Sequence, residues 1–239
     1  MKNTAAAWLM GIALMASTAL SAQWKKIKGE GQPVKEARTV SAFQAVKLSG
    51  GMKVLITKGS HQVQVEAEPN LMPYIETEVS GSTLQVRTKQ GYSIGSRGIV
   101  IHVSMPTITA ASIAGSGQIE SVGTLDGASQ FDANISGSGD IKMAITTGKT
   151  KATINGSGDI LLQGNTQDVE VRISGSGSYK GFALKATDAK VQISGSGNAE
   201  TAADGKIDAA ISGSGHIYYK GNAQVSLRSS GSGHLKKVD

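Results

Sequence analysis

The stretch that decides the fold is "ISGSGDI", residues Ile135 to Ile141. Its Gly-Ser-Gly core occurs seven times, and the first glycines of successive copies are 22, 19, 19, 20, 18 and 18 residues apart. A period near 20 residues with small variations is typical of a solenoid whose coils differ in their loops. The paired glycines are Gly115 and Gly117, Gly137 and Gly139, Gly156 and Gly158, Gly175 and Gly177, Gly195 and Gly197, Gly213 and Gly215, and Gly231 and Gly233.

The residues before each Gly-Ser-Gly alternate between apolar and polar. The column two positions before the first glycine is isoleucine in six copies and Ser229 in the last. The column four positions before is always Ala, Val or Leu, whereas the residues between the two columns, such as Arg172, are mostly polar. Because residues two apart in a strand share a face, both columns are predicted to point inward. The predicted core ladder is Ile113, Ile135, Ile154, Ile173, Ile193 and Ile211.

A second apolar position follows each Gly-Ser-Gly, as at Ile119, Ile141 and Ile160. Each copy therefore predicts a strand, a bend at the glycines and a second strand. Glycines at this density would destabilise a helix, but they suit tight corners. The pattern predicts an all-β fold, a parallel β-helix with coils of about 18 to 22 residues. Right-handed winding is expected because crossovers between parallel strands are right-handed.

The chain before the repeat has a different pattern. Residues 23–36 form a lead segment, residues 37–108 a β region continuous with the solenoid, and residues 109–239 the repeat itself. A degenerate coil is visible around Gly50, followed by two predicted hairpins. One joins "MKVLI" and "QVQVEA" through "TKGSH", and the other joins "YIETEV" and "LQVRT" through "SGST". The last copy, with Ser229 and "HLKKVD", is predicted to cap one end; the hairpin segment or another chain covers the other.

Residues 1–22 have the pattern of an export signal. Lys2 precedes an apolar run from Ala5 to Leu14, and small residues follow, so cleavage is expected after Ser21 or Ala22. That run is too short for a comfortable membrane span, and no transmembrane segment is expected in the mature chain. The protein is predicted to be exported to the periplasm, the outer-membrane surface or the extracellular space. It has no cysteine, so it has no disulfide.

The formal net charge is +6, but the basic residues are scattered rather than clustered in a stripe. Scattered lysines are typical of a solvated surface, so no nucleic-acid partner is expected. Nor is a catalytic or cofactor site expected. No Gly-x-Ser-x-Gly elbow is present, and the segment "TTGKTK" at 146–151 lacks the earlier glycine of a phosphate-binding loop.

Two pairs of side chains in the column after each corner could hold a metal ion. Asp140 beside Asp159 could share calcium, and His216 beside His234 could bind a transition metal. Asp, Asn, Ser and His are also the ordinary residues after a glycine turn, where they bond the local backbone. We therefore assign no metal site, and keep these four residues as candidates. His61 and His102 have no partner that the sequence reveals.

Carbohydrate chemistry is the alternative that such a fold permits. A sugar site needs clustered carboxylates and exposed aromatic rings, whereas here the acidic residues are dispersed and only 4% of the chain is aromatic. Tyr179, Tyr218 and Tyr219 could form a small sugar-contacting patch, and Trp24 stands at the start of the mature chain. Core packing for Tyr179 and surface filling for the other two are the competing interpretation.

Two blocks besides the coils resemble a known family: "RTVSAFQAVKLSGGMKVLITKG" (Arg38 to Gly59) and "VEAEPNLMPYIETEVSGSTLQV" (Val65 to Val86). In their order, followed by the "SGSG" coils, they are similar to the auto-transporter adhesin, head GIN domain family of exported bacterial proteins. The resemblance implies a right-handed β-helix, adhesion at the cell surface and a host in the Bacteroidetes group. The expected function is a non-enzymatic adhesin or scaffold whose repetitive polar surface binds a glycan or a protein; the alternative is a periplasmic carbohydrate-binding or carbohydrate-active protein. Self-association through the ends or sides of the solenoid is also expected.

Overall fold

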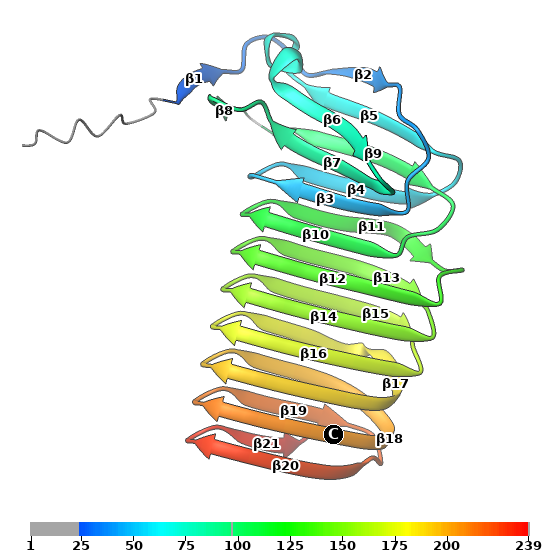
Figure 1. Ribbon diagram of the computed structural model, residues 1–239, viewed down its shortest axis with the longest axis vertical. Helices are drawn as coiled ribbons and strands as arrows, with labels where there is room; N and C mark the ends of the chain where they lie inside the picture. Colours follow the sequence, from blue (N-terminus) through cyan, green and yellow to red (C-terminus); the bar gives the residue numbers. More distant parts are fainter. Residues whose placement is uncertain (1–23, 97, 239) are drawn as a thin grey trace, which may run out of the picture.

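The computed structural model describes residues 24–96 and 98–238, so the predicted export signal lies outside the described residues. The chain winds into two facing walls of strands, and successive coils descend as a right-handed solenoid (Figure 1). The predicted all-β, right-handed parallel β-helix is thereby confirmed.

Two names are used below for the walls. The front wall consists of β3 (Ala45–Ser49), β10 (Ala110–Gly115), β12 (Gln130–Gly137), β14 (Lys149–Gly156), β16 (Asp168–Gly175), the second halves of β17 (Ser178–Gly195) and β18 (Asn198–Gly213), and β20 (Gln224–Gly231). The back wall consists of β4 (Lys53–Lys58), β11 (Gln118–Leu125), β13 (Asp140–Thr146), β15 (Asp159–Asn165), the first halves of β17 and β18, β19 (His216–Lys220) and β21 (His234–Lys237). Neighbouring strands within each wall are parallel and pair like residues of the repeat, as Ile135 with Ile154.

Each Gly-Ser-Gly forms the corner between a front strand and the following back strand, and its two glycines serve different purposes. Gly137 has a φ of +126°, which side chains other than hydrogen rarely allow. At Gly139 the constraint is space, because a Cβ would lie 2.8 Å from Cγ2 of Ile113 in the preceding coil. The backbone N–H groups of Ser138 and Asp140 donate to Gly115 and Gly117 at 2.9 and 3.0 Å. Corners therefore stack through hydrogen bonds as the strands do.

The apolar columns lie between the two walls. The six isoleucines of the ladder are between 0 and 3% exposed, and the isoleucines that follow the corners, such as Ile141, are fully buried. A single cluster of buried side chains extends from Phe43 to Ile217, so the N-terminal β region and the solenoid share one core. In-register stacking thus converts the sequence period into a continuous apolar column.

Tyr179 takes the place of isoleucine in the column after the corner, and it is 1% exposed. Its ring has room because Gly181 carries no side chain, since a Cβ there would clash with the ring. Burial raises the pKa of the phenol. Its hydroxyl has no hydrogen-bond partner among the described residues.

An unpaired buried hydroxyl is destabilising. We therefore expect Tyr179→Phe to raise the free energy of unfolding by about 1 kcal/mol, because it removes the hydroxyl and keeps the ring. Urea unfolding followed by circular dichroism measures the change. A destabilisation of similar size would contradict the prediction, because it would mean that the hydroxyl makes a favourable bond.

The N-terminal strands continue both walls beyond β3 and β4. In front, β7 (Thr83–Thr88) pairs in parallel with β3, and β6 (Ile75–Ser80) pairs with β7 as the predicted hairpin. Behind, β9 (Val100–Met105) pairs with β4, and β5 (Gln62–Ala67) and β2 (Val34–Arg38) extend the sheet. The helix η1 (Pro69–Tyr74), a single 3-10 segment, joins the two sheets over the top (Figure 1). The sequence left open whether the hairpin segment or another chain covers this end of the solenoid. In the structure the hairpin segment covers it. No helix in the described residues is long and apolar enough to cross a membrane.

The other predicted hairpin, between residues 53–58 and 62–67, is wrong. Both strands exist and run in opposite directions, but β9 lies between them, parallel to β4 and antiparallel to β5. The backbone N–H of Gly59 accordingly donates to Met105 at 3.0 Å. The turn "TKGSH" therefore spans a third strand rather than joining two neighbours.

The C-terminal coil covers the core of the coil before it, where Ile211 is 2% exposed, but its own inward side is open. Within the described residues β20 pairs only with β18, and every residue of β20 is exposed. Val225 and Leu227 occupy inward positions of the repeat, yet they are 39 and 44% exposed. The last copy therefore covers the preceding coil but does not close the end of the solenoid, because Ser229 alters only one of its inward positions.

Candidate functional site

The outer face of the front wall carries rows of like residues, one from each coil. The row next to the corners is rich in serine, and the parallel register places each member beside its counterpart in the next coil. Its members are Ser136, Asn155, Ser174, Ser194, Ser212 and Ser230. The last five members, together with the row two residues earlier, line a depression of about 500 Å³ across five coils. The wall thus offers regularly spaced hydroxyl and amide groups.

Two arginines flank this depression, Arg172 from β16 and Arg228 from β20. The Arg172 guanidinium contacts Glu170 at 2.6 Å and donates to Gln192 at 3.1 Å, and the Arg228 guanidinium lies 3.1 Å from Asp208. Both side chains are about half exposed or more. The carboxylates hold each planar guanidinium in one orientation, so its remaining N–H groups are available to a ligand.

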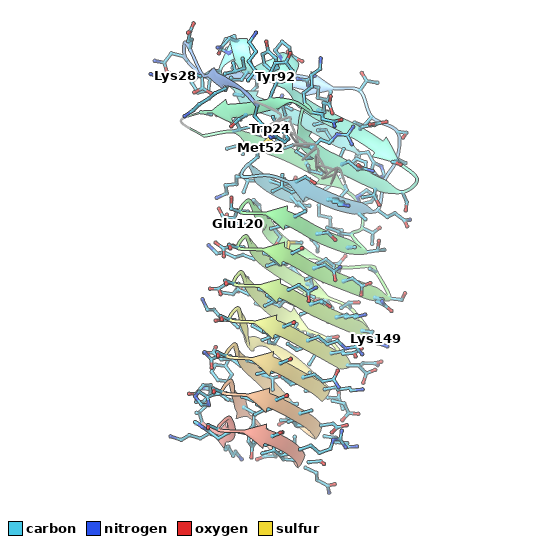
Figure 2. The ribbon with its side chains drawn as sticks, turned by 60° about the vertical axis from the view of Figure 1, so that its left-hand side comes forward. Trp24, Lys28, Met52, Tyr92, Glu120 and Lys149 are labelled. Atoms are coloured by element: carbon cyan, nitrogen blue, oxygen red, sulfur yellow. The ribbon has the colours of Figure 1, made fainter. Side chains whose placement is uncertain are left out.

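A charged row lies further from the corners, where successive coils alternate in sign. It runs through Asp132, Lys151, Glu170, Lys190 and Asp208, each in register with the next. The neighbouring row, which includes the labelled Lys149 (Figure 2), borders a second depression of about 370 Å³. Opposite charges in adjacent coils attract each other and hold the net charge of this part of the wall near zero.

The calcium candidates lie on the back wall, and Asp140 is in register with Asp159 as the repeat predicts. The Asp159 carboxylate, however, already accepts from Nζ of Lys180 at 2.6 Å. This hydrogen bond is the main reason that the pKa of Lys180 is raised. No group of three or more potential metal ligands occurs in residues 24–96 and 98–238. The arrangement is that of a cross-coil ion pair.

The other candidate pair, His216 and His234, is in register on the last two back strands. Their ring centroids are 4.0 Å apart with an interplanar angle of 35°, so the two rings pack closely in a tilted arrangement. Nδ1 of His216 is buried and has no partner among the described residues. Tyr218 contacts both rings edge-on. With Tyr218, the two histidines form an aromatic cluster.

The remaining two histidines have partners that the sequence did not reveal. His102 on β9 lies 2.7 Å from the Glu66 carboxylate on β5, and this hydrogen bond is the largest cause of the lowered pKa of Glu66. His61 contacts the backbone oxygen of Phe43 at 2.8 Å. Both contacts join residues that are far apart in the chain, so no local motif could have predicted them.

The three tyrosines do not form a patch, because Tyr179 is buried and Tyr219 packs against the core. Trp24 lies instead beside Tyr92 at the other end of the molecule (Figure 2), where both line one cleft. Sequence reasoning missed this cleft, because its two aromatic residues are far apart in the chain. The only signal was the presence of both rings in a chain that is poor in aromatic residues.

Solved structures from the Bacteroidetes are similar to this fold. A structure described as a putative adhesin from Bacteroides fragilis matches with a TM-score of 0.84 at 23% identity, covering 89% of this chain and 100% of its own. One described as a putative lipid binding protein from Parabacteroides distasonis matches at 0.72 and 25% identity, and a putative adhesin from Parabacteroides merdae at 0.71 and 21%. Each of these two covers 90% of this chain and 100% of its own.

Among curated proteins, none matches the chain. A family model described as "Putative auto-transporter adhesin, head GIN domain" matches residues 42–223, which include the N-terminal β region and all but the last coil of the solenoid. The chain therefore belongs to the auto-transporter adhesin, head GIN domain family.

Proposed function

We propose that the protein is an exported adhesin that acts by binding rather than by catalysis, and that its ligand-binding surface is the front wall of the solenoid. The observation that carries this proposal is the in-register array on that wall, where the serine row and the oriented arginines Arg172 and Arg228 line one depression across five coils. A cavity of about 500 Å³ is within the usual size range for ligand sites.

The mechanism is the addition of shallow contacts that repeat along the wall. Each coil contributes a hydroxyl or amide group and a backbone held in place by the neighbouring coils. A ligand with its own repeat, a surface glycan or an extended protein segment, engages several coils at once, and the second and later contacts form at high effective concentration. The membership of an adhesin family supports this interpretation.

The test is a comparison of two double variants on opposite walls. Arg172→Ala/Arg228→Ala removes both oriented guanidiniums from the front wall, and Lys142→Ala/Lys180→Ala removes two back-wall lysines that are also ion-paired. Probes are printed arrays of purified bacterial and host glycans and of extracellular-matrix proteins. We expect the front-wall variant to lose roughly tenfold or more in affinity for its ligand, because interfacial arginines are often hot spots.

The back-wall variant should bind as the wild type does. Both variants should stay folded and lose similar, small amounts of stability, because exposed ion pairs contribute at most about 1 kcal/mol each. Binding that survives in the front-wall variant would contradict the proposal. The absence of any binding on both arrays would also contradict it.

A further inference from the structure

The largest cavity among those described lies at the N-terminal end, away from the repetitive part of the front wall. It has a volume of about 1,010 Å³. One side is formed by Trp24 together with Tyr92 and Ile94 of β8 (Tyr92–Gly95), and another by Glu76 and Arg87 of the β6–β7 hairpin. The first corner, around Gly50, forms its floor. Its lining residues thus place the cleft at the junction of the N-terminal strands and the first coil.

Trp24 is held at this cleft by a small two-stranded sheet. The strand β1 (Lys25–Lys28) pairs in parallel with β8, so that Lys25 lies opposite Tyr92. The backbone N–H of Lys25 donates to Gly91 at 3.0 Å. The tryptophan side chain is nevertheless 62% exposed. A large apolar ring that is positioned by backbone hydrogen bonds and left uncovered is typical of a binding residue.

Tyr92 supplies a second ring, which is fixed by its neighbour. Its centroid lies 4.6 Å from that of Tyr74 at an interplanar angle of 46°. Tyr74 ends η1, so the pair joins β8 to the helix over the top of the core. The aromatic side of the cleft therefore combines one exposed ring with one ring that is packed in place.

The cleft is also lined by oriented hydrogen-bonding groups. Nε of Arg87 donates to Glu76 at 2.8 Å, and a second guanidinium nitrogen lies 3.4 Å from Glu78. The hydrogen bond with Glu76 is the main cause of the raised pKa of Arg87. Lys89, Gln90 and Ser93 border the same space. Donors and acceptors are thus arranged within reach of two aromatic faces.

From this arrangement we propose that the cleft binds a neutral oligosaccharide. A sugar ring presents C–H groups on its face, which pack on an aromatic ring, and hydroxyl groups at its edge, which both donate and accept hydrogen bonds. The volume suits several linked sugar rings rather than one small molecule. An acyl chain would leave Glu76 and Arg87 desolvated without partners from the ligand.

An anionic membrane surface is the competing occupant, because Lys25, Lys26 and Lys28 follow the exposed tryptophan. The cleft lining itself is not strongly cationic, because the Arg87 guanidinium is already paired with the Glu76 and Glu78 carboxylates, which leaves Lys89 as the one unpaired cation among the lining residues. The inference rests on the proposed function in that it takes the protein to be a binding protein, and it names a ligand class. The binding surface that it assigns is the cleft, which is separate from the front wall.

The test uses the processed protein, in which Trp24 is the one remaining tryptophan, because Trp8 lies in the predicted export signal. A printed array of neutral oligosaccharides identifies the probe, and titration of the best binder is followed by Trp24 fluorescence and by calorimetry. We expect the emission to shift to shorter wavelength on binding. Calorimetry should show that Trp24→Ala weakens affinity roughly tenfold or more. Trp24→Phe, which keeps an aromatic face, should restore part of the loss.

Lys26→Ala on the same strand is the matched control and should leave the oligosaccharide affinity unchanged. Vesicles containing phosphatidylglycerol form a second arm of the experiment. The inference is overturned if no neutral oligosaccharide binds, if Trp24→Ala binds as the wild type does, or if vesicles bind and oligosaccharides do not. Loss of oligosaccharide binding in Arg172→Ala/Arg228→Ala but not in Trp24→Ala would place the ligand on the front wall. That result would overturn the inference about the cleft and leave the proposed function of the front wall standing.

Discussion

Replacing Ile173 by aspartate is expected to abolish cooperative folding of the solenoid. Ile173 is 2% exposed, and it stacks between Ile154 and Ile193 in the core ladder. The substitution removes a buried apolar side chain, which alone costs about 2 to 5 kcal/mol, and places a carboxylate where no partner can reach it. The sum is comparable to the whole stability of a typical domain, about 5 to 15 kcal/mol.

The adjacent residue provides the control. Arg172 is about half exposed, and its contacts with Glu170 and Gln192 lie on the surface. Arg172→Ala should therefore change the free energy of unfolding by about 1 kcal/mol or less. Urea unfolding and limited proteolysis measure both variants. Proteolysis is needed because a solenoid can lose a few coils locally, and cleavage near residue 173 would reveal this. Equal effects of the two substitutions would refute the assignment of inward and outward faces.

The solenoid could be predicted from the sequence because its period and its side-chain alternation are both local. Gly137 and Ile135 recur at fixed offsets, and parallel stacking brings each of them beside its own counterpart, Gly156 and Ile154. No long-range pairing had to be deduced, since one repeat determines the register of the next. The same argument placed Gly50 at the corner of the first, degenerate coil, and β3 does stack in register on β10.

The order of the N-terminal strands could not be predicted in the same way. The alternating residues of β4 and β5, joined by a short glycine-containing turn, fit a hairpin as well as they fit the observed arrangement. β9 enters between them from about 35 residues further along the chain. Its own alternation is compatible with any neighbour. Strand patterning predicts which face is buried, but it does not predict which strand is adjacent.

The candidate site shows the same difference between residues of the repeat, which could be predicted, and residues outside it, which could not. The rows of the front wall are repeat positions, so their outward direction could be deduced from the sequence. Register placed Asp140 beside Asp159 and His216 beside His234, as the repeat predicts, but the ion pair of Asp159 with Lys180 and the packing of the two histidine rings depend on side-chain conformations. The cleft at Trp24 depends on the pairing of β1 with β8, which breaks the repeat altogether. Sites formed by residues of the repeat could therefore be predicted from the sequence. Sites formed by residues outside the repeat, such as the cleft at Trp24, could not.

Replacing Gly139 by alanine is expected to destabilise the solenoid by about 3 kcal/mol, although only one methyl group is added. The second glycine of each corner lacks the left-handed φ of the first, so backbone strain does not contribute. Its new Cβ would lie 2.5 Å from the Gly117 carbonyl oxygen and 2.8 Å from Cγ2 of Ile113. The coils can separate only by stretching the hydrogen bond from Asp140 to Gly117 and loosening the ladder.

Gly51→Ala separates this packing effect from the general loss of a corner glycine. Gly51 lies in the first corner, where the nearest atom to its Cβ would be Oγ of Ser116 at an ordinary 3.5 Å. We expect its effect to stay within about 0.5 kcal/mol, as for other unstrained surface positions. Urea denaturation of both variants supplies the comparison. Similar losses of stability would mean that the corners need glycine for flexibility, whereas a loss confined to Gly139→Ala would show that close stacking of neighbouring coils requires the second glycine of each Gly-Ser-Gly.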